Sequence, residues 1–351
     1  MITFLFYLPF LLLFVVFAVY GERKIAAFMQ DRYGPHYVGP KGTLQSIADL
    51  LKGLQKENIV PAAADRFIFL HAPLVMFVFI FAGYSILPLN SEVDGAIVQS
   101  GIFILLAIVS LDVMGVMMAG WGSNNKYSIY GALRSAAQIV SYEIPLGLTV
   151  LCVVMTAQSL DLQEIIRQQG PLSQEDNFFL GIKSLEVGGV GGFISWNVFR
   201  NPFLLIVFLL FYIAGLAESN RAPFDLPESE SELVGGYHTE YSGFRFLVFM
   251  LAEYAMLLLV CIFGVALFLG GWYSPLPNFG GLTLADWTNG PIWGTFWLLS
   301  KAMVLVFIAV WIRWTYPRLR VDQLMSLSWK YLTPAALLLV FICGIWRLWM
   351  V

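Results

Sequence analysis

The sequence predicts an all-α polytopic membrane protein, and three observations support this fold class. Of its 351 residues, 59% are hydrophobic and only 12% are charged, whereas soluble domains are about 45–50% apolar and about 25% charged. Several apolar stretches reach the roughly 20 residues that a membrane helix needs. Lys and Arg are also distributed unevenly between alternate connections. Together with the net charge of −3, these features exclude a soluble enzyme, a disordered chain and a nucleic-acid-binding protein.

Eight apolar segments are candidate transmembrane helices. They cover approximately residues 2–20, 67–89, 97–121, 139–159, 202–217, 246–270, 292–311 and 331–349. The first lacks the positive start and small-residue cleavage site of a secretory signal, so we expect it to be a helix of the mature protein. We expect residues 1–351 to form a single transmembrane domain.

The positive charges predict how these helices are oriented. Cytoplasmic loops of membrane proteins are enriched in Lys and Arg. With eight spans, 15 of the 20 Lys and Arg residues fall in the first, third, fifth and seventh connections, and only four fall on the other side. Omitting one span would mix the two groups. We therefore expect both termini on the outer, periplasmic side.

The first inner connection contains a predicted amphipathic helix over about residues 43–57. Leu44, Ile47, Leu51 and Leu54 follow helical spacing on one face, and polar residues line the other. Two interpretations remain open. The helix lies on the bilayer surface, or it covers a cavity.

Five ionisable residues are expected at or near membrane depth, where charge is costly and usually functional. They are Asp112, Glu143, Glu218, Glu253 and Lys301. Each could pair locally and only fix helix packing. Four carboxylates on consecutive spans instead favour a shared polar path of the kind that relays protons.

An acidic inner loop spans about residues 218–245. It combines acidic side chains with Pro223, Phe224 and Pro227, which is unusual for a solvated charged loop. We expect it to be ordered. Its acidic residues include Asp225, Glu228, Glu230, Glu232 and Glu240.

The cysteines and histidines do not predict a metal centre. The three cysteines are about a hundred residues apart, without a C-x-x-C pair, and the three histidines are also far apart. An iron–sulfur cluster held by this chain is not expected.

Several long motifs carry a family resemblance. They are E-R-K at 22–24, Q-D-R-Y-G-P at 30–35, V-G-P-K-G-T-L-Q-S-I-A-D-L-L-K at 38–52, R-S-A-A-Q-I-V-S-Y-E at 134–143, A-E-S-N-R-A-P-F-D-L-P-E-S-E-S-E-L-V-G-G-Y at 217–237, E-Y-S-G-F-R-F at 240–246 and Y-P-R-L-R-V-D-Q-L-M at 316–325. From about residue 20 to the last span, the chain resembles the NuoH family of respiratory complex I, the proton-pumping NADH:quinone oxidoreductase.

The resemblance implies roles for particular residues. The positions matching the family's quinone chamber are Arg23, Arg32, Asp49, Lys52 and Arg313. The positions matching its path toward the antiporter-like subunits are Glu143, Glu218 and Glu253. The acidic loop between chamber and path is matched by Asp225, Glu228, Glu230 and Glu232. No residue is expected to be catalytic by itself or to bind a metal.

The resemblance also implies partners and a location. Quinone would be the substrate, while FMN, NADH and the iron–sulfur clusters would belong to partner subunits. The partners would be hydrophilic quinone-site subunits, small membrane subunits and antiporter-like subunits in a bacterial inner membrane. A mitochondrial inner or thylakoid membrane is the alternative location. The alternative function is the related membrane subunit of an energy-converting hydrogenase or formate hydrogenlyase, but the dense E-S-E-S-E-L-V block favours the quinone enzyme.

Overall fold

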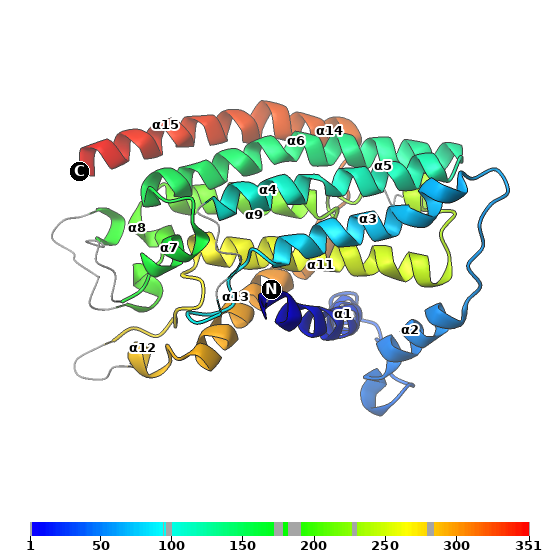
Figure 1. Cartoon of the computed structure of the whole chain (residues 1–351), viewed down its shortest axis with the longest axis horizontal. Helices are drawn as coiled ribbons and strands as arrows, with labels where there is room; N and C mark the ends of the chain where they lie inside the picture. The colour runs from blue at the N-terminus through cyan, green and yellow to red at the C-terminus, as the bar shows by residue number, and fades with distance from the viewer. Residues whose placement is uncertain are drawn as a thin grey trace.

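The protein folds as a set of long helices that lie side by side (Figure 1). The computed structural model describes residues 2–93, 95, 100–171, 178–181, 191–226, 230–278 and 284–350. Within these ranges there are helices and no strand. Seven helical segments are long and apolar enough to cross a membrane, which confirms the all-α, multi-pass fold class.

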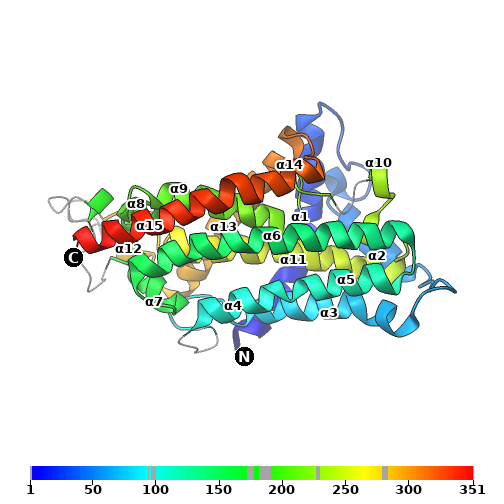
Figure 2. The ribbon, with the colours of Figure 1, turned by 90° about the horizontal axis from the view of Figure 1, so that it is seen from above.

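The first two spans differ in tilt. Helix α1 (Ile2–Met29) continues nine residues past its predicted end, so the E-R-K motif lies on the helix and not in a loop. It crosses the other long helices at a steep angle (Figure 2). Helix α3 (Arg66–Tyr84) begins after Asp65, whose carboxylate accepts hydrogen bonds from two backbone N–H groups of the first turn. Such a cap satisfies donors that a helix start leaves unpaired.

The third span is interrupted near its middle. It consists of α4 (Gly101–Ser110) and α5 (Asp112–Gly122), which meet at Leu111. The fourth span, α6 (Lys126–Ala157), begins 13 residues earlier than predicted because its polar first turns continue the helix beyond the apolar segment. Asp112 therefore lies at a helix break, and Arg134 lies on α6.

Helix α9 (Leu204–Glu218) corresponds to the predicted fifth span but has only 15 residues. At about 1.5 Å per residue it is roughly 22 Å long, shorter than the hydrocarbon layer of about 30 Å. The described segments thus include seven full-length candidates and this shorter apolar helix. The count of eight spans stays a prediction.

Helix α11 (Gly243–Phe268) is the core of the bundle. Its most apolar window is 72% buried, more than that of the other candidate spans, and it packs against α3, α9 and α13 (Pro291–Thr315). The last span is continuous through α14 (Val321–Ser326), the π-helix η5 (Leu327–Leu332) and α15 (Thr333–Met350).

Helix α2 (Gln45–Gln55) is the predicted amphipathic helix, slightly shorter than expected. Its small residues Ser46 and Gly53 are buried, and Gly53 faces Leu247 of α11. The apolar side chains of Ile47 and Leu51 remain exposed in this chain. The helix therefore turns its small residues to the bundle and leaves its apolar face uncovered.

The remaining helices are short and lie in the connections. Figure 1 places α2 at one end of the bundle and α7, α8 and α12 at the other. The short elements are η1 (Pro40–Gly42), α7 (Leu162–Arg167), η2 (Phe179–Gly181), η3 (Gly192–Ser195), α8 (Asn197–Arg200), α10 (Glu230–Leu233), η4 (Gly236–His238) and α12 (Leu284–Trp287).

Candidate functional site: a buried chain of polar residues

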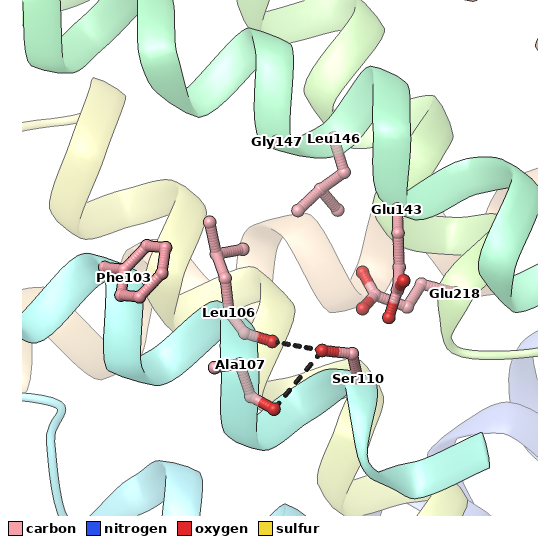
Figure 3. Close-up of a pocket in the computed structure, with 8 residues that line it drawn as sticks. All are labelled: Phe103, Leu106, Ala107, Ser110, Glu143, Leu146, Gly147 and Glu218. Atoms are coloured by element: carbon pink, nitrogen blue, oxygen red, sulfur yellow. Dashed lines mark hydrogen bonds between the residues drawn. The ribbon is translucent and has the colours of Figure 1, made fainter.

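A pocket lies between α4, α6 and α9 and contains two of the predicted carboxylates. Its volume is about 200 Å³, and Glu143 and Glu218 line it together with mainly apolar side chains. Figure 3 shows the two carboxylates reaching the same part of the pocket from different helices. Glu218 is only 3% exposed, whereas Glu143 is half-buried. The Ser110 hydroxyl on the facing helix donates to carbonyls of its own turn.

A second cluster surrounds Glu253 in the third turn of α11. The Tyr237 hydroxyl donates to Glu253 Oε1 over 2.9 Å, and His238 Nε2 lies 3.5 Å from the same oxygen. Arg221 Nη2 lies 3.9 Å from Oε2. All four side chains are buried. The short helix η4, which carries Tyr237 and His238, thus brings the acidic loop against the centre of the bundle.

Asp112 lies within electrostatic range of both groups of carboxylates. Glu218 interacts electrostatically with both Glu143 and Asp112, and Asp112 interacts in turn with Glu253. These residues come from four different helical segments, α6, α9, α5 and α11. The sequence could not show that the intramembrane carboxylates are near one another, and the structure brings them together.

The chain of polar contacts continues from Arg221 toward the first span. The Arg221 guanidinium lies over the Tyr254 ring, 3.9 Å from its centroid. The Tyr254 hydroxyl donates to Glu22 Oε2 over 2.6 Å. Glu22 also forms an ion pair with Arg313 at the end of α13. This end of the series of polar contacts therefore contains one of the predicted quinone-chamber residues, Arg313.

The remaining predicted chamber residues are distributed over α1, α2 and the loop between them. Arg23 forms an ion pair with Asp49 of α2, and Gln45 donates to the same carboxylate over 3.0 Å. Partial burial opposes ionisation of Asp49, but these two hydrogen bonds and the positive charges of Arg23 and Lys52 lower its pKa. Lys52 and Arg32 are themselves exposed, and Arg32 lies apart in the loop after α1.

The acidic loop is held by basic residues of neighbouring segments. Asp225 pairs with Arg318 Nη2 at 3.2 Å, and Glu232 pairs with Arg134 of α6 at 2.6 Å. Glu230 begins α10. Glu228 lies outside the residues that the structure describes. The ordered loop predicted from its prolines is consistent with these contacts for the residues that are described.

Five residues of this series of polar contacts were not predicted as site residues: Glu22, Arg221 and Tyr254, together with Tyr237 and His238 beside Glu253. Glu22 was visible in the E-R-K motif, but it looked like a loop residue because the first span was placed too short. Tyr254 gave no signal, since an aromatic residue in an apolar helix usually indicates packing. Lys301 lies apart from the site, because its ammonium donates to the carbonyls of Leu269 and Tyr273 after α11.

Comparison with known proteins places this geometry in a family. The sequence matches the NADH dehydrogenase family over residues 2–344. It is 55% identical to the NADH-quinone oxidoreductase H-subunit 2 of Cytophaga hutchinsonii, with all of both chains covered. It is 50% identical to the NADH-quinone oxidoreductase H-subunit of Chlorobaculum parvum, over 95% of this chain and 88% of the relative. The chain therefore belongs to the NADH dehydrogenase family, as a relative of the NuoH-type membrane component of the multi-subunit enzyme NADH-quinone oxidoreductase.

Proposed function

We propose that this subunit forms the quinone-chamber entry and the charged path that couples quinone reduction to proton translocation. One observation carries the proposal. A series of buried and half-buried ionisable and hydroxyl side chains runs from Arg313 and Glu22, through Tyr254 and the Glu253 cluster, to the pocket at Glu143 and Glu218. Such side chains are costly in a membrane and are found mainly along ion and proton pathways.

The α1–α2 end of this path has the features expected of a quinone entrance. A quinone with a hydrophobic tail must arrive from the bilayer, so the entrance needs an apolar wall. The uncovered face of α2 provides one, and Arg23, Asp49 and Lys52 lie on or beside this helix. The guanidinium and ammonium groups are hydrogen-bond donors suited to a quinone head group. In this proposal Arg32, in the exposed loop after α1, guides the quinone at the rim of this entrance.

The coupling step depends on charge in a poorly solvated region. Quinone reduction takes up two electrons and two protons, so protons drawn from groups near Glu22 and the acidic loop leave those groups more negative. Coulomb interactions there amount to about 4 kcal/mol at 4 Å, compared with about 1 kcal/mol in water. In our proposal this change passes through Asp225, Glu228, Glu230 and Glu232 to Glu253, Glu218 and Glu143.

The proposal includes a membrane arrangement. Eight spans, with α9 as the fifth, place both termini on the periplasmic side of a bacterial inner membrane. Hydrophilic subunits carrying the iron–sulfur clusters, FMN and the NADH site dock on the opposite side, at α2 and the acidic loop. Small membrane subunits and antiporter-like subunits continue the path from the pocket. The two relatives described above are named for quinone reduction, which disfavours a hydrogenase component.

The substitutions Glu143→Gln and Glu218→Gln test the path in the assembled complex. Each replaces an ionisable group with a neutral one of nearly equal size. We expect several-fold lower quinone reductase activity and proton pumping, while electron transfer to a water-soluble acceptor is retained. Glu164→Gln, at an exposed carboxylate of α7, is the matched control and should behave as wild type. Full pumping in an assembled Glu143→Gln variant would refute the proposed path.

A further inference from the structure

Helix α6 contains a proline in the turn that carries Glu143. Pro145 has no N–H, so it cannot donate to the carbonyl four residues earlier in the helix, which is that of Ser141. A carbonyl without a donor is strongly unfavourable at membrane depth, and neighbouring helices commonly supply the missing partner through Ser or Thr side chains. Ser141 O therefore needs a donor from outside the α6 backbone.

Ser328 of the last span supplies this donor. Its hydroxyl donates to Ser141 O over 2.6 Å, and the side chain is fully buried. Two further contacts join the same turns. The Tyr142 hydroxyl donates to Leu324 O over 3.0 Å, and the Ser141 hydroxyl lies 3.6 Å from the sulfur of Met325. The last span is thus attached to α6 at the point where α6 lacks its own hydrogen bond.

The attachment point is also irregular on the side of the last span. Ser328 lies in the π-helix η5, and the backbone N–H of Thr333 donates to Ser328 O, five residues earlier. The Thr333 hydroxyl donates to the same carbonyl over 2.9 Å. Pro334 follows and has no N–H to continue the α-helical pattern. Short π-helical turns of this kind occur frequently at functional sites.

Glu143 lies between Ser141, which accepts the hydrogen bond from Ser328, and Pro145. It is two residues after Ser141 and two before Pro145, so its side chain projects from α6 about 200° away from that of Ser141. In Figure 3 it points into the pocket between α4 and α9. A change in the conformation of this turn would therefore move the Glu143 carboxylate relative to that of Glu218.

We propose that Ser328 is a positioning residue for Glu143. Its hydroxyl replaces the hydrogen bond that Pro145 removes from α6, and so fixes the turn that presents the carboxylate to the pocket. The role of the pocket in proton transfer rests on the proposed function above. The hydrogen-bond replacement itself does not, and it can be tested separately.

A double-mutant cycle tests the replacement in the assembled complex. Ser328→Ala should increase hydrogen exchange of the α6 amides around residues 144–148 by about fivefold, as expected for one lost buried hydrogen bond. Pumping should fall with it. Pro145→Ala restores an N–H that can donate to Ser141 O. In that background Ser328→Ala should change exchange less than about twofold, and pumping should recover.

Two controls separate positioning from general damage. Ser328→Thr keeps the hydroxyl and should retain more pumping than Ser328→Ala. Ser300→Ala removes an exposed hydroxyl that bonds only to Phe296 of its own helix, so exchange in α6 should not change. Equal effects of Ser328→Ala in both backgrounds would overturn the inference, even if Glu143→Gln blocks pumping. If Ser328→Ala increases exchange only when Pro145 is present, but Glu143→Gln pumps normally, the proposed function is refuted, and with it the positioning role.

Discussion

Tyr254 is the residue at which the two halves of the polar chain meet. Its hydroxyl reaches Glu22, and its ring lies beneath Arg221. These contacts can be removed one at a time, because phenylalanine keeps the ring and loses only the hydroxyl. A cation over an aromatic ring contributes about 2 kcal/mol or more when it is shielded from water, so both contacts matter to the position of Arg221 and Glu22.

We therefore expect graded effects of two substitutions at this position. Tyr254→Phe removes the donor to Glu22 and should lower quinone reductase activity moderately, by about fivefold, the equivalent of one hydrogen bond. Tyr254→Leu also removes the ring under Arg221 and should lower activity further. Initial rates with a short-chain quinone measure both effects. Equal activities of the two variants would show that the contact of the Tyr254 ring with Arg221 does not contribute to quinone reductase activity.

The Arg23–Asp49 pair predicts a pH dependence for the contact between α1 and α2. Asp49 has a lowered pKa, so its ion pair stabilises the folded state at neutral pH and is lost only as the pH falls through that pKa, below 3.8. The pair is partly exposed, so its contribution is at most about 1 kcal/mol. Spin labels on α1 and α2 should report an unchanged distance distribution from pH 6 to 8. Asp49→Asn should broaden it over the same range, and an identical distribution would contradict this.

At the scale of elements, α6 and η4 approach each other closely at Gly131. A Cβ added at Gly131 would lie 2.7 Å from Gly236 Cα and 2.9 Å from Tyr237 N, and both atoms belong to the backbone. No side-chain rotation can relieve such contacts. This glycine lets η4 approach closely enough for Tyr237 to bond Glu253.

Gly131→Ala should therefore separate η4 from α6 and destabilise the protein by about 1–3 kcal/mol, the usual cost of overpacking. Gly21→Ala is the matched control, because a Cβ at this helical glycine of α1 meets nothing within 4 Å. It should be neutral or stabilising by about 0.5–1 kcal/mol. Thermal inactivation of the purified complex compares the two. A similar inactivation temperature for both variants would show that η4 can move away freely.

The sequence predicted the elements better than their contacts. Apolar length located the spans, since a membrane imposes one length on every helix, and helical periodicity located α2. The ends of α1 and α6 were misplaced because both helices continue beyond their apolar segments. The contact of Glu22 with Tyr254 joins residues 232 positions apart. No local pattern encodes such a pair, so only the packing of α1 against α11 reveals it.

At the scale of the whole molecule, the arrangement depends on whether the short helix α9 crosses the membrane. The asymmetry of positive charge predicts that it does. Helix α9 packs against α6. If α9 crosses, α7 and α14 lie on opposite sides. If it does not, the number of crossings between them changes by one, and both lie on the same side.

Single cysteines at Glu164 of α7 and Asp322 of α14 distinguish these arrangements, because both native side chains are exposed and the native cysteines are buried. With eight spans, a membrane-impermeant maleimide added to intact cells should label Glu164→Cys and not Asp322→Cys. Detergent-opened membranes should allow labelling of both, which controls for shielding by partner subunits. The charge distribution makes the same prediction independently, since Arg318 and Arg320 adjoin α14 on the side rich in Lys and Arg. Labelling of both cysteines from outside would place α9 within one leaflet, and the fifth connection could then not bring its acidic residues to the inner face.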